Sequence, residues 1–235
     1  LNNHNTFKLL IMSEIKQVVI LAGGKGTRMR EMTEDLPKPM VQIGNRPVLE
    51  HLIDIYDKYG NFNYLICSGY LGEKISKHFK NNKKVSVIET GEETNTGGRL
   101  YKLRDYLDEN FMITYGDGLA NVRVDNLMKQ FFEKKNIGTI TVTNPVSRFG
   151  LVEFDKNQTI NKFIEKPKLD GFINIGFMIF KKHFFEFLNE DSVLESSPLN
   201  ALTNIGELNA FIHEGYFEPM DTYREYLHMN NLWDS

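Results

Sequence analysis

A glycine-rich loop and two basic residues are the part of this sequence best suited to chemistry. The apolar run Val18-Val19-Ile20-Leu21 predicts a buried strand, and Ala22-Gly23-Gly24-Lys25-Gly26-Thr27-Arg28 follows it directly. Glycines allow a sharp turn that exposes backbone N–H groups, and a loop of this kind can hold phosphate. Because bare amides leave most of a triphosphate's charge unneutralised, Arg28 and Lys38 matter as much as the glycines. The pattern therefore predicts phosphate chemistry at the end of a strand.

Two better-known glycine loops do not fit. A P-loop requires Lys followed by Ser or Thr after its last glycine, whereas Lys25 precedes Gly26. A dinucleotide-binding loop requires a third glycine where Met29 stands, together with an acidic residue about twenty residues later. The missing glycine and acid disfavour an oxidoreductase. A turn that merely connects a strand to a helix stays open as an alternative, since a single glycine-rich turn is a weak signal.

Two aspartates stand directly after apolar segments and are candidates for a metal site. Asp117 follows the predicted strand over 111–115, and Asp221 follows the segment 217–220. Mg²⁺ usually takes one or two protein carboxylates, with phosphate oxygens and water as its other ligands, so two separate aspartates suit it. Both residues also have structural alternatives, because Asp117 could cap a turn and Asp221 could cap the helix that follows it.

The composition is that of an ordinary globular protein that keeps its cysteine reduced. Of the 235 residues, 41% are hydrophobic and 25% are charged, and the net charge is −3. This balance gives no general attraction to nucleic acid or to an anionic membrane, so a phosphate site must be local. The single cysteine, Cys67, excludes an internal disulfide and a cysteine metal cluster. We expect a cytoplasmic protein with neither nucleic acid nor membrane as a partner.

Strands and helices alternate along the chain. Periodicity predicts strands over 18–21, 64–67, 85–88, 111–115, 139–142 and 208–213. It predicts helices over 47–59, 72–79, 98–107, 126–135, 198–205 and 223–232. This order is typical of an α/β fold, with a Rossmann-like, mostly parallel sheet flanked by helices and a ligand where strand carboxyl ends meet loops. Several short strands over 150–180 predict a small β-rich portion.

Several motifs carry a resemblance to a known family. The glycine loop followed by Pro37-Lys38-Pro39-Met40 is similar to the signature of the nucleotide-sugar pyrophosphorylases, which join a sugar 1-phosphate to a nucleoside triphosphate. Further motifs most resemble the glucose-1-phosphate cytidylyltransferase branch of that family. These are Glu89-Thr90-Gly91, Thr96-Gly97-Gly98-Arg99-Leu100, Thr114-Tyr115-Gly116-Asp117-Gly118, Arg148-Phe149-Gly150, Glu165-Lys166-Pro167-Lys168 and Pro219-Met220-Asp221-Thr222. The resemblance runs from Val18 to Trp233.

The resemblance implies an enzyme that uses Mg²⁺ to combine CTP and glucose 1-phosphate into CDP-glucose, with release of pyrophosphate. It implies that Arg28, Lys38 and Lys166 are catalytic and that Asp117 and Asp221 hold the metal. It assigns nucleotide binding to Leu21, Ala22, Gly23, Gly24, Lys25, Gly26, Thr27, Arg28, Lys38, Thr94, Gly98, Arg99 and Gly116. It assigns sugar-phosphate binding to Gly150, Glu165, Lys166 and Asn174. The cations suit this reaction, because attack of one phosphate on another brings two anions together.

The same reasoning divides the chain. Residues 1–13 are predicted to be an N-terminal extension, either disordered or foreign to the protein, since Met12 is a candidate start. Residues 14–235 are predicted to form a single domain of the nucleotide-diphospho-sugar transferase type. Within it, the nucleotide-binding half covers about 14–142 and the sugar-phosphate-binding half about 143–235. The sequence leaves open whether the protein forms a homo-oligomer.

Other readings of the site also stay open. The segment between Phe79 and Glu89 is shorter than in the cytidylyltransferases. The substrates could therefore be a nucleotide with another base or another phosphorylated acceptor. A non-catalytic nucleotide-sensing domain could use the same fold. Such a domain could dispense with the catalytic lysines and the two aspartates, yet the sequence retains them all.

Overall fold

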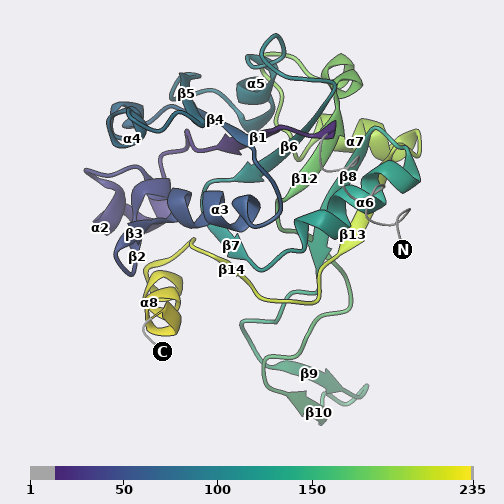
Figure 1. Ribbon diagram of the computed structural model, residues 1–235. Coiled ribbons are helices and arrows are strands. Elements are labelled where there is room, and N and C mark those ends of the chain that lie inside the picture. The colour runs from purple at the N-terminus through teal and green to yellow at the C-terminus, as the bar shows by residue number, and fades with distance from the viewer. Residues whose placement is uncertain (1–13, 234–235) are drawn as a thin grey trace, which may run out of the picture.

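An eight-stranded sheet is the centre of the fold in a computed structural model that describes residues 14–233 (Figure 1). The predicted extension over residues 1–13 lies outside the described residues. The strand order is β11-β8-β12-β6-β1-β4-β5, and β13 also pairs with β8. The strands are β1 (Gln17–Leu21), β4 (Asn63–Ser68), β5 (Val85–Glu89), β6 (Asn110–Tyr115), β8 (Gly138–Thr143), β11 (Ile173–Asn174), β12 (Met178–Lys181) and β13 (Leu208–Ile212).

The sheet is mixed but mostly parallel, as predicted. Strand β1 pairs in parallel with β4 and β6, β4 pairs in parallel with β5, and β8 pairs in parallel with β13. Only β11 and β12 run in the opposite direction, and β12 inserts between β6 and β8. Strands on both sides of the predicted border near residue 142 therefore belong to one sheet. The sheet sets a common edge at which the carboxyl ends of β1 and β6 meet.

Both faces of the sheet are buried, and the alternation in β1 shows how. Val18 and Ile20 belong to one apolar core, whereas Val19 and Leu21 belong to the other, because successive side chains of a strand point to opposite faces. Helices α3 and α6 pack in the first core, and α5 and α7 in the second (Figure 1). The helices are α2 (Arg30–Thr33), α3 (Val48–Asp57), α4 (Gly72–Phe79), α5 (Thr96–Tyr101), α6 (Val124–Lys134), α7 (Ser197–Asn204) and α8 (Tyr223–Trp233).

The largest difference from the predicted helices concerns α5. It begins two residues earlier than predicted and ends at Tyr101 instead of reaching residue 107. Beyond its end the chain continues in tight turns, in which the Leu103 N–H donates to the Leu100 carbonyl and the Tyr106 N–H donates to the Leu103 carbonyl. These turns keep Leu103 and Leu107 buried, so the apolar spacing resembles that of a longer helix.

Several short elements carry no periodic signal and were not predicted. They are the strands β2 (Gln42–Ile43), β3 (Arg46–Pro47), β7 (Gly118–Ala120) and β14 (Phe217–Pro219), and the 3₁₀ helices η1 (Thr27–Met29), η2 (Lys38–Met40) and η3 (Lys182–Phe187). Strand β7 pairs with β14 in antiparallel fashion. This small sheet matters for the site, because it follows one predicted metal ligand and precedes the other.

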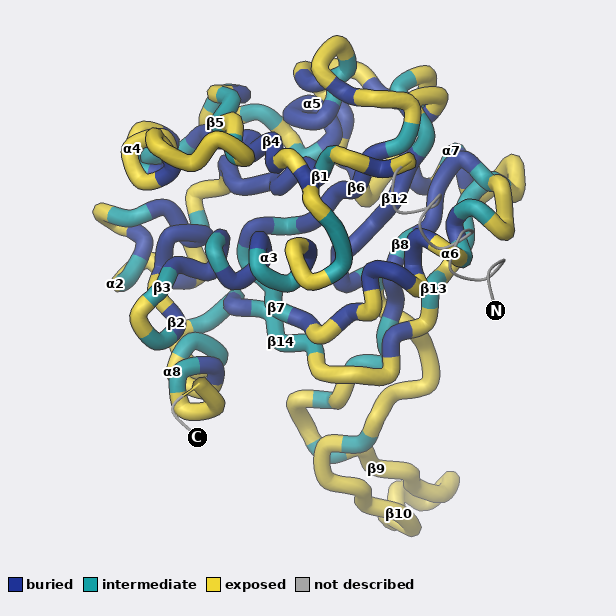
Figure 2. Tube along the Cα trace, in the orientation of Figure 1, coloured by how far each residue is buried: buried dark blue, intermediate teal, exposed yellow. Residues whose placement is uncertain are grey.

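A two-stranded hairpin projects from the body of the molecule (Figures 1 and 2). It consists of β9 (Leu151–Phe154) and β10 (Ile160–Ile164), and every residue of both strands is exposed. The predicted β-rich portion over 150–180 is thus confirmed, with the hairpin as its outermost part. None of the helices within residues 14–233 is long and apolar enough to cross a membrane.

Candidate active site

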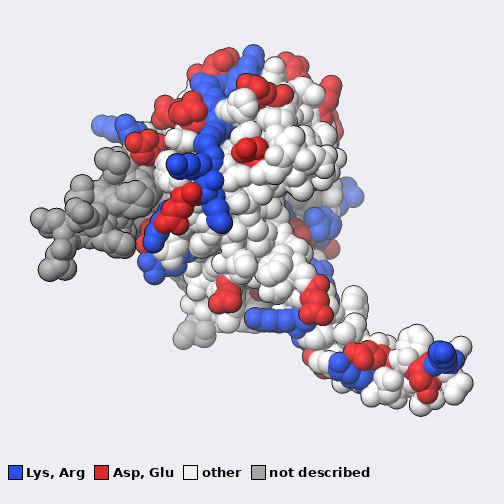
Figure 3. All heavy atoms as spheres, turned by 90° about the vertical axis from the view of Figure 1, so that its right-hand side faces the viewer, with Lys and Arg blue, Asp and Glu red and all other residues white. Residues whose placement is uncertain are grey.

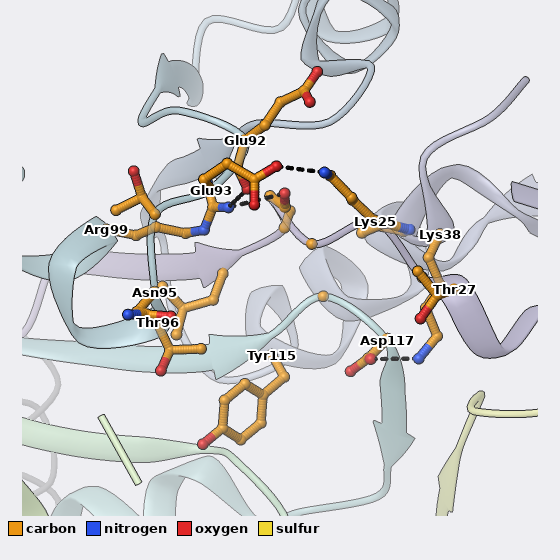
Figure 4. A pocket seen from close by; sticks show the side chains of 18 of the residues that line it. Lys25, Thr27, Lys38, Glu92, Glu93, Asn95, Thr96, Arg99, Tyr115 and Asp117 are labelled. Carbon is orange, nitrogen blue, oxygen red and sulfur yellow. Dashed lines mark hydrogen bonds and ion pairs between the residues drawn. The ribbon is translucent and has the colours of Figure 1, made fainter. Parts of the chain in front are cut away.

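A pocket of about 520 Å³ opens at the carboxyl ends of β1 and β6, within the range of small-molecule sites (Figure 4). Residues predicted to bind the nucleotide or metal line it, namely Leu21, Ala22, Gly23, Gly24, Lys25, Gly26, Thr27, Arg28, Lys38, Thr94, Arg99, Gly116 and Asp117. Residues to which the sequence analysis assigned no role complete the wall, namely Pro39, Glu92, Glu93, Asn95, Thr96, Tyr115, Val193 and Glu195. The structure thus brings most of the predicted nucleotide side together.

Arg99 supports the glycine loop from behind. Its buried guanidinium donates to the carbonyls of Gly23 (2.9 Å), Gly91 (2.7 Å) and Glu92 (3.0 Å). Burial lowers the pKa of Arg99, but the many acceptors satisfy its N–H groups. A methyl group at Gly23 would lie 2.0 Å from a guanidinium nitrogen, which explains why this position needs glycine. Arg99 therefore connects the glycine loop to the segment before α5.

The glycine loop ends in a left-handed turn and faces an acidic segment. Gly26 has φ of 60° and leads into η1, a conformation that suits glycine because it has no Cβ. Across the pocket, Lys25 forms an ion pair with Glu93 (Figure 4). Both partners are solvent-exposed, and such pairs contribute little to stability. The pair can therefore open when a ligand enters.

Lys38 lies between the two predicted metal ligands. Its Nζ is 2.6 Å from Asp117 Oδ2 and 2.8 Å from Asp221 Oδ1, and the Arg28 guanidinium is 3.0 Å from Asp221 Oδ2 (Figure 4 shows the first of these bonds). Pro37 and Pro39 flank Lys38 at the start of η2, so its backbone has little freedom. The four side chains form a compact cluster of alternating charge: Arg28, Lys38 and Asp117 line the pocket, and Asp221, which is not among the lining residues, contacts Lys38 and Arg28 from outside the wall.

Burial and charge act against each other in this cluster. Burial alone would lower the pKa of Lys38, but the carboxylates of Asp117 and Asp221 outweigh it, so the pKa is raised. Burial would raise the pKa of Asp221, but Lys38 and Arg28 hold it below its ordinary value. Lys38 and Asp221 are therefore both charged at neutral pH.

The pairing of β7 with β14 brings the two aspartates together. Gly118, directly after Asp117, pairs with Pro219, and the Met220 N–H donates to the Asp117 carbonyl at 2.8 Å. Asp221 then follows immediately. The two carboxylates reach the same ammonium group although a long stretch of chain separates them.

Asp221 does not cap α8, so the alternative role considered for it in the sequence analysis is wrong. Thr222 Oγ1 accepts a hydrogen bond from the Glu225 N–H at 3.3 Å, and Glu225 Oε2 accepts from the Thr222 N–H at 2.8 Å. This reciprocal arrangement resembles a capping box and occupies the start of the helix. Glu225 Oε2 also accepts from the Asp221 N–H at 2.9 Å. The Asp221 carboxylate is thus left to face Lys38 and Arg28.

Glu195 and Tyr115 form a part of the wall that the sequence analysis missed. Glu195 accepts hydrogen bonds from the Tyr115 hydroxyl at 2.6 Å and from the Thr96 hydroxyl at 2.8 Å. Tyr115 is the last residue of β6, so its place before Gly116-Asp117 could have identified it. Nothing in the sequence around Glu195 marks it, because the irregular segment after η3 carries it to the pocket.

The predicted sugar-phosphate residues lie apart from the pocket wall. Gly150, Glu165 and Lys166 are at the base of the hairpin, and Lys166 Nζ is 3.9 Å from Glu165 Oε1. Lys166 has φ of 47°, a left-handed conformation that costs a non-glycine residue about 1–3 kcal/mol. Asn174 lies closer, since its amide nitrogen is 3.4 Å from the hydroxyl of Tyr115, which lines the pocket.

Gly98 has a packing role in the structure. A Cβ at this position would lie 2.1 Å from the carbonyl oxygen of Glu190, so only glycine permits α5 to approach that segment. Gly98 is not among the residues that line the pocket. Its predicted contact with the nucleotide stays a prediction.

The carboxylates of Asp117 and Asp221 suit a magnesium ion. Both carboxylates contact the Lys38 ammonium group, so their oxygens lie close together. Carboxylate oxygens are the hard ligands that Mg²⁺ prefers, and phosphate oxygens and water usually complete the coordination of Mg²⁺. Within residues 14–233 there is no group of three or more His, Cys, Asp or Glu side chains that could hold a metal ion. The donor set therefore fits a metal that a nucleotide helps to bind better than a permanent structural ion.

A glycine loop over a charged pocket at the carboxyl edge of a mostly parallel sheet defines a nucleotide-binding α/β protein. Comparison with known proteins makes this more specific: the Nucleotidyl transferase family matches residues 17–215. The chain belongs to this family and is an enzyme of the nucleotidyltransferase type, which confirms the resemblance seen in the motifs.

Individual relatives match over almost their full length. The chain is 37% identical to a probable glucose-1-phosphate cytidylyltransferase of Bacillus subtilis, over 93% of this chain and 96% of the relative. It is 36% identical to the glucose-1-phosphate cytidylyltransferase of Salmonella typhi, over the same shares. Among solved structures, HddC from Yersinia pseudotuberculosis complexed with GMP-PN superposes with a TM-score of 0.71 at 26% identity, over 93% of this chain and 99% of HddC.

Proposed function

We propose that this protein is a Mg²⁺-dependent sugar-1-phosphate nucleotidyltransferase that makes CDP-glucose and pyrophosphate from CTP and glucose 1-phosphate. The names of two relatives that align over nearly their whole length support this choice of substrates. The observation that carries the proposal is the cluster of Lys38, Asp117, Asp221 and Arg28 under the glycine loop.

The reaction requires two anions to approach each other. An oxygen of the sugar phosphate attacks the α-phosphorus of the nucleotide, a new P–O bond forms, and the bond to pyrophosphate breaks. Transfers of this kind are catalysed mainly by positioning and by neutralising charge. Lys38 is buried, held between prolines and charged, so it is suited to neutralise the triphosphate. Arg28 bonds to the Asp221 carboxylate and would add a second positive charge.

We assign Asp117 and Asp221 to the metal. When bound there, Mg²⁺ would add positive charge next to the phosphate oxygens of both substrates. The backbone of the loop over Leu21–Arg28 would hold the triphosphate, with Gly116 beneath it. Thr94, Gly98 and Arg99 would shape the place of the base and ribose.

The acceptor would bind outside the wall of this pocket, toward the base of the hairpin. Lys166 would hold the phosphate of the acceptor, and Gly150 would line the same region. The Glu165 carboxylate would accept hydrogen bonds from the sugar hydroxyl groups, and the Asn174 amide could donate or accept them. This assignment divides the domain into a nucleotide-binding half over 14–142 and a sugar-phosphate-binding half over 143–235. We also place the protein in the cytoplasm, where its substrates and a reduced Cys67 would be found.

A substrate screen tests the proposal. Each of the four common nucleoside triphosphates is combined with a panel of sugar phosphates in the presence of Mg²⁺, and released pyrophosphate is measured. We expect the highest turnover with CTP and glucose 1-phosphate. The GTP arm is the most informative competitor, because the structure of HddC holds GMP-PN. Release of pyrophosphate from none of the pairs would contradict the proposal and favour a nucleotide-sensing domain.

A further inference from the structure

One carboxylate in the pocket wall is held by neutral hydroxyl groups. Glu195 lines the pocket, and its Oε1 accepts a hydrogen bond from the Tyr115 hydroxyl at 2.6 Å, while its Oε2 accepts one from the Thr96 hydroxyl at 2.8 Å. Among residues 14–233, no Lys, Arg or His forms an ion pair with Glu195. The two hydroxyls therefore fix the direction of the carboxylate, and each of its oxygens keeps a second lone pair for a ligand.

Two glycines at the start of α5 allow the segment that carries Glu195 to lie against the pocket. The Gly98 N–H donates to the Ser192 carbonyl at 2.9 Å, and a Cβ at Gly97 would lie 2.7 Å from the Ser192 Cβ. A side chain at either glycine would push the segment away. Packing against α5 thus fixes the backbone that carries Glu195, while its side chain stays accessible from the pocket.

Tyr115 connects this carboxylate to a residue assigned to the acceptor. Because the hydroxyl proton is donated to Glu195, the Tyr115 oxygen is left to accept, and the Asn174 amide nitrogen donates to it at 3.4 Å. Asn174 Oδ1 accepts from the Gly176 N–H at 3.1 Å. Burial, together with the Glu195 carboxylate, raises the pKa of Tyr115, so its hydroxyl keeps the proton at neutral pH. The direction of the Asn174 amide therefore depends on Glu195.

Opposite charges are divided between two sides of the pocket. Figure 4 shows Tyr115 and Thr96 on one side, and Lys25 and Lys38 on the other. On the face shown in Figure 3, acidic and basic side chains lie side by side, the projecting hairpin included, so this face does not sort substrates by charge. Inside the pocket, a carboxylate repels phosphate at short range but accepts hydrogen bonds from hydroxyl groups. The side of Glu195 therefore suits an uncharged, hydroxylated part of a substrate.

We propose that Glu195 determines acceptor specificity by accepting a hydrogen bond from a hydroxyl group of the sugar, and that it positions Asn174 through Tyr115. The acceptor has to reach the phosphates of the nucleotide inside the pocket, so its sugar passes the edge where Asn174 contacts Tyr115. The inference rests on the proposed function, since it requires a sugar phosphate as the acceptor.

Deoxy analogues of the acceptor test this inference. Release of pyrophosphate by the unchanged enzyme and by Glu195→Gln is measured with the nucleoside triphosphate that the substrate screen selects. The acceptors are glucose 1-phosphate and its 2-, 3-, 4- and 6-deoxy analogues. The variant keeps an oxygen that accepts hydrogen bonds but loses the charge, so its kcat/KM for glucose 1-phosphate should fall by about tenfold or more. The KM for the nucleotide should stay nearly unchanged.

One of the analogues should identify the hydroxyl group that Glu195 contacts. In the unchanged enzyme, this analogue should have a kcat/KM about tenfold below that of glucose 1-phosphate, whereas in Glu195→Gln it should lose little more, because the two partners of one interaction are not additive. A change in the fold alone would lower kcat/KM for all acceptors alike and leave these ratios as they were.

Two further variants separate positioning from structure. Tyr115→Phe removes the hydroxyl that links Glu195 to Asn174, so it should raise the KM for glucose 1-phosphate. Glu190→Gln changes an exposed carboxylate of the same segment that does not line the pocket, so it should match the unchanged enzyme. Circular dichroism and melting temperature check the fold of each variant.

The outcomes distinguish this inference from the proposed function. If every analogue loses the same factor in the unchanged enzyme and in Glu195→Gln, the inference is overturned. The same holds if Glu195→Gln changes only the KM for the nucleotide, because the ribose also carries hydroxyl groups. An unchanged KM in Tyr115→Phe would overturn the positioning of Asn174. Absence of pyrophosphate release from the unchanged enzyme would instead contradict the proposed function, and this inference with it.

Discussion

The pocket and the region proposed to bind the acceptor are built in different ways. On the nucleotide side, the Lys38 side chain is 10% exposed, and the strands, prolines and carboxylates around it fix its position. In the region proposed for the acceptor, the Lys166 side chain is 53% exposed and stands at the base of a hairpin whose strand residues are all exposed. The comparison indicates that packing within the chain fixes the side chains of the pocket, whereas the side chains at the base of the hairpin are open to solvent.

The largest effect should come from the charged cluster of Lys38, Asp117 and Asp221. Replacing Lys38 with Met, or Asp117 or Asp221 with Asn, should lower turnover by about a hundredfold or more, because each change removes charge that faces the reacting phosphates. Pyrophosphate release measures the loss, and circular dichroism checks the fold. Near-normal turnover in both aspartate variants would refute the metal assignment and with it the idea that this side is preorganised.

Lys166 tests the acceptor side. The Lys166→Ala variant should raise the KM for the sugar phosphate by about tenfold or more, as expected for loss of a charge-assisted hydrogen bond, and change the KM for the nucleotide much less. Lys168→Ala, two residues away, is the matched control and should change neither value appreciably. The reverse ranking of the two KM values would exchange the assigned half-sites.

The contact between Gly23 and Arg99 should have a smaller effect, and this effect concerns the stability of the fold. Gly23→Ala places a methyl group against the Arg99 guanidinium and should lower the free energy of unfolding by about 1–3 kcal/mol. Gly24→Ala is the matched control, since a Cβ there would have no neighbour within 4 Å. Chemical denaturation of both variants measures the difference. Equal stability would show that Arg99 does not hold the loop.

The ion pairs of Asp221 should give the smallest effect, about 1 kcal/mol, and a defined pH dependence. The pKa of Asp221 in the folded protein lies below the ordinary value of 3.8, so its ionised form stabilises the fold above that pH. The stabilisation is lost as the pH falls through the lowered pKa. The difference in unfolding free energy between the unchanged protein and Asp221→Asn should therefore shrink below about pH 4.

Denaturation between pH 2.5 and 7 checks this pH dependence. Asp105→Asn serves as the control, because the Asp105 carboxylate is largely exposed and does not line the pocket. A difference for Asp221→Asn that stays constant with pH would show that Lys38 and Arg28 do not stabilise the charged carboxylate.

The sequence predicted what local patterns encode. Strands such as β1 and β6 were found because continuous apolar runs are typical of strands that are buried on both faces. The glycine loop and Asp117 were found because they follow those strands, and Lys38 was found because it stands between two prolines in a motif that resembles the family signature. The approach of Asp221 to Asp117 could not be derived, because β7 and β14 have three residues each and show no periodicity.

Other features depend on distant contacts. The role of Arg99 as a support for the glycine loop follows from its hydrogen bonds to the carbonyls of Gly23, Ser68 and Gly91, which lie in three separate segments that no local spacing connects. Glu195 reaches Tyr115 through an irregular segment for the same reason. The pattern over 150–180 predicted several short strands but gave no sign that two of them project into solvent.

Arg99 has a consequence for any attempt to redesign base preference. One guanidinium holds the carbonyl of Gly23 and those of Gly91 and Glu92, so the glycine loop and the segment proposed to border the base are mechanically coupled. Exchanging residues 91–95 for those of a relative with a different nucleotide would also shift the triphosphate, unless the transplanted backbone offers its carbonyls in the same directions.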